Sequence, residues 1–116
     1  MDNGRTDRLD RFQRRIGSFI AERDWEKFHR PKDVAMALSI ESAEIMELYL
    51  WDRAPDREEL EDEIADVLFF LLDLATREGI DLEKAFERKM GKNEAKYPAS
   101  VVQGKDLKYD RYPTRP

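Results

Sequence analysis

Four carboxylates have a spacing that could hold a metal ion: Glu41, Glu44, Glu63 and Asp66. The members of each pair are three positions apart, so within a helix they lie on one face. On a helical wheel, Glu41 and Glu44 fall in the middle of an apolar stripe, and Glu63 leads a row of core spacing. Two carboxylates in an apolar face repel each other and lose hydration, so a positive charge must compensate them. No Lys or Arg occurs between residues 34 and 51, so that charge must come from elsewhere.

Oxygen ligands of this kind favour a hard cation, Mg²⁺ or Mn²⁺, with water completing its shell. Di-iron bundles usually add Glu-x-x-His motifs, but the only histidine, His29, lies in a predicted loop. A single Glu pair on a helix more often belongs to a solvated face. Two pairs that interrupt the apolar stripes of successive helices rarely belong to solvated faces. If these two helices pack antiparallel, the four carboxylates meet, and Mg²⁺ held by few protein ligands ordinarily binds a phosphate.

Helical periodicity predicts the elements that position these carboxylates. The predicted helices span about residues 6–22, 32–51, 57–78 and 82–96, and residues 98–116 form an irregular basic tail. Thr6 suits an N-cap, and Pro31 suits the start of the second helix. Asp56 and Glu59 suit a capping box for the third helix, which Gly79 ends. No segment favours a strand, so the sequence predicts one domain, an all-α four-helix bundle.

Composition and charge exclude several classes of function. The 116 residues are 41% apolar and 41% charged, which suits helices with one dry stripe and one charged face. A net charge of −5 argues against a nucleic-acid partner, and the absence of cysteine excludes disulfides and thiolate metal sites. Neither a span of ~20 apolar residues nor a secretory signal is present, so we expect a cytoplasmic protein without a membrane partner. The second helix is also apolar behind its carboxylates, at Met36 and Leu50 for example, which predicts a homo-oligomer.

With these residues the chain resembles the MazG-type all-α nucleoside triphosphate pyrophosphohydrolases, particularly the dCTP pyrophosphatase branch, from about residue 12 to 109. The resemblance rests on an ordered series of segments: RDWEKFHRPKD (23–33), ALSIESAEIMELYLW (37–51), DEIADVLFFLLDLA (62–75), GIDLEKAFERKMGKNEAKYP (79–98) and GKDLKY (104–109). It implies that Glu41, Glu44, Glu63 and Asp66 are the magnesium ligands. It also implies a homotetramer built as a dimer of dimers.

The same resemblance implies a nucleoside pocket lined by aromatic residues and one histidine: Trp25, Phe28, His29, Trp51 and Phe70. Aromatic planes can stack a base, worth about 1–3 kcal/mol on nucleic-acid platforms. The alternatives are that Trp25 and Phe28 only seal the end of the bundle, that His29 is solvated, and that Trp51 is structural.

Two residues depart from the family pattern. Ile40 stands immediately before Glu41, where the family often has a second Glu, and Phe70 stands where dCTP-type enzymes often have Tyr. Because Phe70 lacks the tyrosine hydroxyl, the sequence does not determine which base and sugar the protein prefers.

A polar stripe on the fourth predicted helix supplies further candidates at i, i+4, i+7 and i+8: Lys89, Asn93, Lys96 and Tyr97. In the KxxxNxxKYP context of the family, this stripe implies contact with the phosphates and sugar; an isolated row of this kind would be a solvated face. Glu47 is either an outer charge or a base for the attacking water. Weaker candidates are Lys32, Lys108 and Tyr109, the last two in a tail that either folds over a neighbouring subunit or stays loose.

The sequence and the resemblance together predict a Mg²⁺-dependent pyrophosphohydrolase that converts a (d)NTP, dCTP or a modified pyrimidine dNTP, to (d)NMP and pyrophosphate. The expected step is in-line attack of water at phosphorus, which needs no protein nucleophile. Nucleotide-pool sanitation is the expected role. The alternatives are a non-catalytic helical interaction module and a helical bundle that senses nucleotide or metal without hydrolysis.

Overall fold

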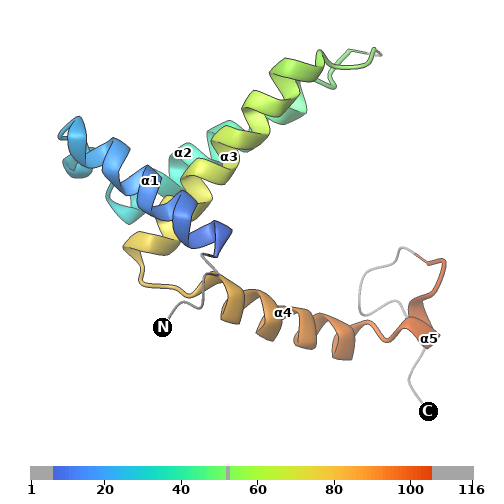
Figure 1. The fold of residues 1–116 in the computed structure, drawn as a ribbon. Coiled ribbons are helices and arrows are strands. Elements are labelled where there is room, and N and C mark those ends of the chain that lie inside the picture. The colour runs from blue at the N-terminus through green and yellow to red at the C-terminus, as the bar shows by residue number, and fades with distance from the viewer. Residues whose placement is uncertain (1–6, 52, 106–116) are drawn as a thin grey trace. The chain divides into compact units, whose positions relative to one another are not determined.

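The computed structural model describes residues 7–51 and 53–105, and within them every element is helical (Figure 1). The elements are α1 (Arg8–Glu22), a short 3₁₀ turn η1 (Glu26–Phe28), α2 (Pro31–Glu47), α3 (Arg57–Arg77), α4 (Leu82–Lys96) and α5 (Ala99–Val102). The all-α prediction is therefore confirmed for the described residues. The chain divides after Ile80 into two compact units, the first with α1 to α3 and the second with α4 and α5. That the four long helices form one bundle stays a prediction.

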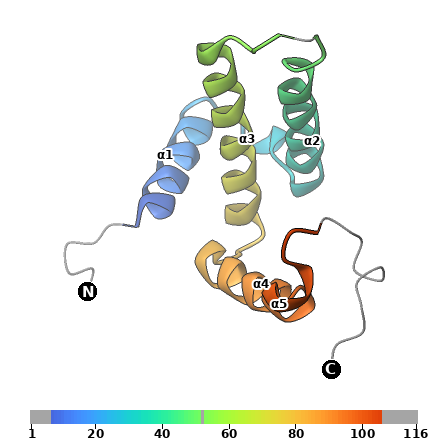
Figure 2. The same cartoon turned by 90° about the vertical axis from the view of Figure 1, so that its right-hand side faces the viewer.

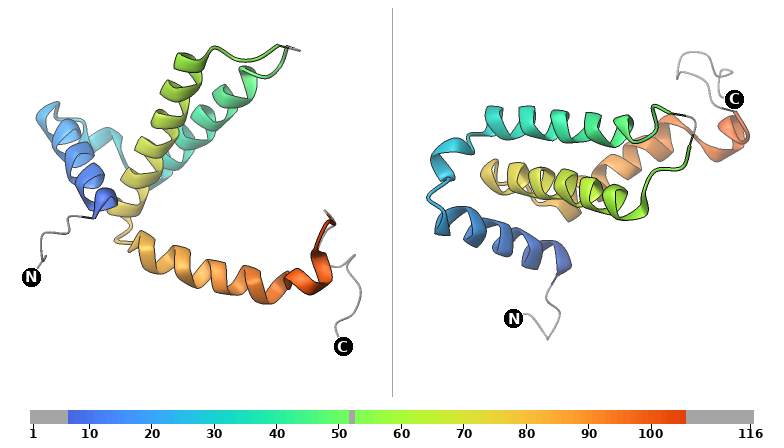
Figure 3. Two further views of the ribbon diagram at one scale, coloured as in Figure 1. Left: turned by 45° about the vertical axis from the view of Figure 1, so that its right-hand side comes forward. Right: turned by 90° about the horizontal axis from the view of Figure 1, so that it is seen from above.

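In the first unit α3 lies between α1 and α2 (Figures 2 and 3). α2 and α3 run antiparallel and pack along each other, which brings the second half of α2 beside the first half of α3. α1 packs against α3 from the other side, where the Gln13 amide donates to the Leu72 carbonyl at 3.3 Å and to the Thr76 hydroxyl at 2.9 Å. α3 is thus the element that both other helices depend on.

Local sequence signals determine where these helices begin. The Asp56 carboxylate accepts from the Glu59 backbone N–H at 3.1 Å, as the predicted cap of α3 requires, and Pro31 is the first residue of α2. α1 begins at Arg8, two residues after the predicted start at about residue 6, and the Asp7 carboxylate caps it by accepting from the Leu9 N–H at 3.0 Å. Thr6, the predicted cap, lies outside the described residues.

Two predicted boundaries were wrong. α2 ends at Glu47 and not at Trp51, because the backbone bonds of residues 48 to 50 tighten from i→i−4 to i→i−3, and the chain leaves the helix in a turn. The tail is not irregular from residue 98: α5 follows Pro98, whose carbonyl accepts from the N–H groups of Val101 and Val102. The fixed φ of proline suits the start of a helix as well as its end. Residues 106–116 of the tail, with Lys108 and Tyr109, lie outside the described residues.

The apolar core of the described residues is small. The buried apolar side chains are those of Ile20, Val34, Leu72 and Ala75. Large apolar side chains remain more than half exposed along α2 and its end, at Met36, Ile40, Met46 and Leu50. Contiguous apolar surface of this kind is typical of an interface with another chain. The predicted oligomer stays a prediction that this surface supports.

Among the described residues, no helix combines the length and the apolar character that crossing a bilayer requires.

α1 and α3 end in the same hydrogen-bonded motif. After α3, the Ile80 N–H donates to the Ala75 carbonyl and the Gly79 N–H to the Thr76 carbonyl, with Gly79 at a φ of +66°. This is a Schellman motif, and Gly79 is the helix end that the sequence predicts. After α1, Trp25 and Asp24 make the matching bonds, but here Asp24 occupies the left-handed position, at a φ of +53°. The strained turn fixes the direction in which Trp25 leaves the helix.

The two motifs predict opposite effects on stability. Gly79→Ala should lower the free energy of unfolding by about 1 kcal/mol, since a Cβ there meets no neighbouring atom and only backbone strain is added. Asp24→Gly should raise it by up to about 1 kcal/mol, because glycine adopts a positive φ without strain. Urea denaturation followed by circular dichroism measures both changes.

Gly17→Ala, inside α1 and also free of contacts, is the matched control and should stabilise the protein. Equal effects of the alanine substitutions at positions 17 and 79 would contradict the assignment of strain to the second.

Candidate metal and nucleotide site

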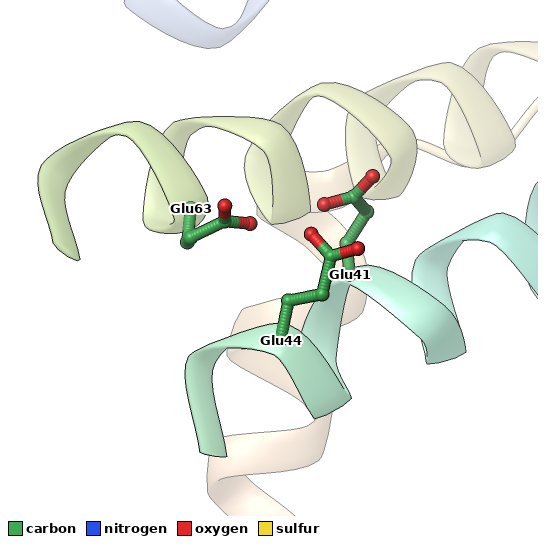
Figure 4. A group of neighbouring side chains, drawn as sticks. All are labelled: Glu41, Glu44 and Glu63. Carbon is green, nitrogen blue, oxygen red and sulfur yellow. The ribbon is translucent and has the colours of Figure 1, made fainter. Parts of the chain in front are cut away.

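Three of the four predicted carboxylates converge between α2 and α3 (Figure 4). Glu41 and Glu44 project from α2 and Glu63 from α3, and one carboxylate oxygen of each lies within 4.8 Å of the others. All three side chains are half-buried. The arrangement follows from the sequence, because the i, i+3 spacing places both α2 carboxylates on the face that α3 covers.

Among the described residues, no Lys or Arg forms an ion pair with the cluster of Glu41, Glu44 and Glu63. The Oε2 atoms of Glu41 and Glu63 are buried and have no hydrogen-bond partner within the described part of the chain. Neighbouring Glu44, together with desolvation, raises the pKa of Glu63 to about 7. Desolvation and then Glu44 raise the pKa of Glu41. Orphaned carboxylate oxygens with raised pKa values fit a site for a hard divalent cation.

Asp66 lies beside this cluster but is not one of its three members. It is exposed, and its charge contributes to the raised pKa of Glu41, so the two carboxylates are close. The aspartate side chain is one methylene shorter than glutamate and starts a helical turn further along α3. Its role as a fourth ligand stays a prediction.

A pocket of about 600 Å³ opens next to the cluster, within the first unit. Its lining combines aromatic side chains with one edge of the acidic cluster: Trp25, His29, Phe70, Glu41 and Asp66 are among its residues. Phe19 supports Trp25 edge to face, with ring centroids 5.9 Å apart. The pocket thus offers flat apolar walls beside carboxylates, the combination that a nucleotide with bound metal requires.

His29 is held in this pocket and is not a solvated loop histidine. Its side chain is 12% exposed, its ring stacks on Phe70 with an interplanar angle of 19°, and its Nδ1 lies 2.8 Å from Oδ2 of Asp73. Asp73 is 3% exposed and also accepts from Arg77 Nε at 3.0 Å. The sequence analysis did not select Asp73, although a signal existed: it is the only charged residue in the run from 67 to 76. A lone acid in an apolar run needs a partner.

The other predicted aromatic residues lie elsewhere. Trp51, 71% exposed, lines a second hollow of about 650 Å³ with Glu44, Glu47 and Glu63, and it is not among the residues that line the pocket with Trp25. Phe28 is 64% exposed and lines neither of these two hollows. The acidic cluster contributes residues to both hollows, so Trp51 and Glu47 lie near its carboxylates. Their contact with a nucleotide stays a prediction.

The predicted polar stripe belongs to the second unit. Lys89, Asn93 and Lys96 lie on α4, and Tyr97 follows its last residue. The Tyr97 N–H donates to the Asn93 carbonyl at 2.8 Å, and the Lys96 ammonium lies 5.7 Å from the centroid of the Tyr97 ring. These contacts order the end of α4. The role of the stripe at the phosphates stays a prediction.

Comparison with known proteins gives consistent results. A model of the MazG-like family matches residues 36–110. The chain is 37% identical over 115 residues to dCTP pyrophosphatase 1 of Homo sapiens and, equally, to that of Rattus norvegicus; each alignment covers 90% of this chain and 68% of the relative. The crystal structure of a pyrophosphatase from Archaeoglobus fulgidus is similar with a TM-score of 0.72 and 39% identity, over 81% of this chain and 95% of that one.

The raised pKa of Glu63 predicts a pH dependence of stability in metal-free protein. Between about pH 4.5 and 7 the folded state keeps the Glu63 proton that the unfolded state has released, so stability from this group is full below pH 4.5 and is lost as the pH rises through 7. In the presence of a chelator, the unfolding free energy of wild type should therefore fall over this range relative to Glu63→Gln. Urea midpoints at a series of pH values measure this difference. Parallel profiles for the two proteins would contradict the assignment.

Proposed function

The chain belongs to the MazG-like family, and from that premise we propose that it hydrolyses a deoxynucleoside triphosphate, dCTP or a modified pyrimidine dNTP, to the monophosphate and pyrophosphate. The observation that carries the proposal is the cluster of Glu41, Glu44 and Glu63, with two buried oxygens that have no hydrogen-bond partner among the described residues, beside an aromatic pocket. The relatives named dCTP pyrophosphatase 1 and the pyrophosphatase of similar structure support the reaction type.

Glu41, Glu44 and Glu63 would hold Mg²⁺, or Mn²⁺ in its place, with Asp66 as the fourth ligand. When bound, the cation supplies positive charge to the cluster and to the triphosphate oxygens. The buried, unpartnered oxygens of Glu41 and Glu63 support this fit, since each gains a partner when a cation is present. Ligands held between two packed helices would position the triphosphate for attack.

The pocket walls orient the nucleoside end of the substrate. Trp25 offers its ring for stacking, while His29 and Phe70 form a stacked pair on the same lining. Glu47 lies by the hollow that Glu44 and Glu63 line and would accept the proton of the attacking water, with Trp51 excluding solvent there. Lys89, Asn93, Lys96 and Tyr97 would neutralise or bind phosphate and sugar oxygens. Water is the nucleophile, and the P–O bond to the pyrophosphate leaving group breaks as the new P–O bond forms.

The proposal extends to assembly and location. We propose a homotetramer, a dimer of dimers, that covers the exposed apolar surface of α2. A net charge of −5 disfavours nucleic acid as a partner. A cytoplasmic role in nucleotide-pool sanitation accords with hydrolysis of free nucleotides.

The metal-ligand assignment predicts the effect of two isosteric substitutions. Glu41→Gln and Asp66→Asn should each lower turnover of dCTP with Mg²⁺ by at least about 100-fold, because each removes a charge that holds the cation. Product analysis should give dCMP and pyrophosphate, and helical circular dichroism should be unchanged. Glu61→Gln is the matched control: it makes the same chemical change on an exposed residue of α3 that lines neither hollow.

Three results would contradict this proposal. Full activity of either variant would remove the metal-ligand assignment, and release of orthophosphate in place of pyrophosphate would exclude the reaction type. Wild-type protein that binds dCTP with Mg²⁺ but turns over no triphosphate in a panel of canonical and modified dNTPs would indicate a nucleotide sensor.

A further inference from the structure

A buried carboxylate on α3 links the pocket histidine to an arginine of the same helix. Asp73 Oδ1 accepts from Arg77 Nε at 3.0 Å, and Asp73 Oδ2 lies 2.8 Å from His29 Nδ1. The side chains of all three residues are largely covered, with exposed fractions of 3% for Asp73, 12% for His29 and 22% for Arg77. None of these three residues belongs to the acidic cluster of Glu41, Glu44 and Glu63.

The contacts of Asp73 determine which nitrogen of His29 carries hydrogen. An ionised carboxylate only accepts hydrogen bonds, so Nδ1 must donate to it. Arg77, which is always charged, also donates to Asp73. His29 stacks on Phe70 and contacts Phe69 edge to face, so aromatic rings flank the imidazole. In the neutral imidazole with hydrogen on Nδ1, Nε2 carries a lone pair, and no other described residue hydrogen-bonds to Nε2.

We infer that Asp73 is a positioning residue that fixes His29 in the Nδ1–H tautomer, so that Nε2 accepts a hydrogen bond from the amino group of the substrate base. The inference rests on the proposed function and identifies the amino group as the feature of the base that the site recognises. Cytosine and adenine carry an amino group on their pairing edge, where uracil and thymine carry a carbonyl oxygen. A carbonyl facing the Nε2 lone pair leaves two acceptors opposed and unpaired, so dUTP and dTTP are disfavoured.

The first test uses the wild-type protein alone. Because His29 is the only histidine, a ¹⁵N-histidine-labelled sample gives one pair of ring nitrogen signals without any need for assignment. The expected spectrum has a protonated Nδ1 and an unprotonated Nε2, and addition of dCMP should shift the Nε2 signal more than addition of dUMP. A protonated Nε2 in the free protein would overturn the inference without any mutation.

The second test reverses the tautomer through Asp73→Asn. Arg77 has only donors to offer, so the amide oxygen in this variant must face Arg77 and the amide NH₂ must face His29. Nδ1 then accepts, Nε2 carries the hydrogen, and the site presents a donor to the base. The ratio of kcat/KM for dCTP to that for dUTP should fall at least about tenfold, mainly through KM for dCTP, with kcat little changed.

Asp81→Asn is the matched control, since asparagine caps α4 as well as aspartate and the residue lines neither hollow. It should leave the substrate ratio and the ¹⁵N spectrum unchanged.

The outcomes separate the inference from the function on which it rests. Loss of activity toward all dNTPs alike in Asp73→Asn, with the wild-type tautomer retained, would make Asp73 structural and overturn the inference while the proposed function stands. A wild-type protein that hydrolyses no dNTP would overturn the proposed function, and with it the role in base selection. If Asp73→Asn does not fold, the wild-type spectrum and its response to dCMP and dUMP decide the question.

Discussion

Mutual repulsion among Glu41, Glu44 and Glu63 is the constraint on which the rest of this structure depends. Three half-buried carboxylates within 4.8 Å destabilise the contact between α2 and α3 unless protons or a cation reduce their charge. The apolar contacts of α3, where Leu72 and Ala75 are buried, must hold the helices together against that repulsion. A cluster of like charges at the contact between two helices is the pattern expected where function and stability compete.

α3 is long enough to carry the repelling carboxylate and the stabilising contacts in different halves of the helix. Its first half carries the carboxylate that faces α2, and its second half carries the buried side chains and the contacts with α1 and His29. The strained turn at Asp24 then directs Trp25 back toward the pocket. One helix therefore connects the charge of the proposed metal site to the aromatic walls of the proposed nucleoside site.

The residues differ in how far the sequence could predict them. The convergence of Glu41, Glu44 and Glu63 was predictable, because helical periodicity fixes which side chains share a face and a short connection makes the helices antiparallel. The end of α2 at Glu47 was not, since it depends on a local tightening of backbone bonds that no glycine or proline marks. The bond between His29 and Asp73 joins residues 44 positions apart through the conformation of a loop, and no periodicity encodes that. Trp51 lies outside α2 for a related reason: it follows the turn that ends the helix, so helical spacing does not locate it.

The sequence separation of these contacts also indicates which of the two parts of the site forms first during folding. The acidic cluster lies entirely within the α2–α3 hairpin, where Glu44 and Glu63 are 19 positions apart. The hydrogen bonds that attach α1 span 59 and 63 positions, so closing that larger loop costs about 1 kcal/mol more in chain entropy. Contacts of short sequence separation form faster. The proposed metal site therefore depends on contacts that are local in the sequence, and the aromatic pocket is completed only when α1 packs against α3.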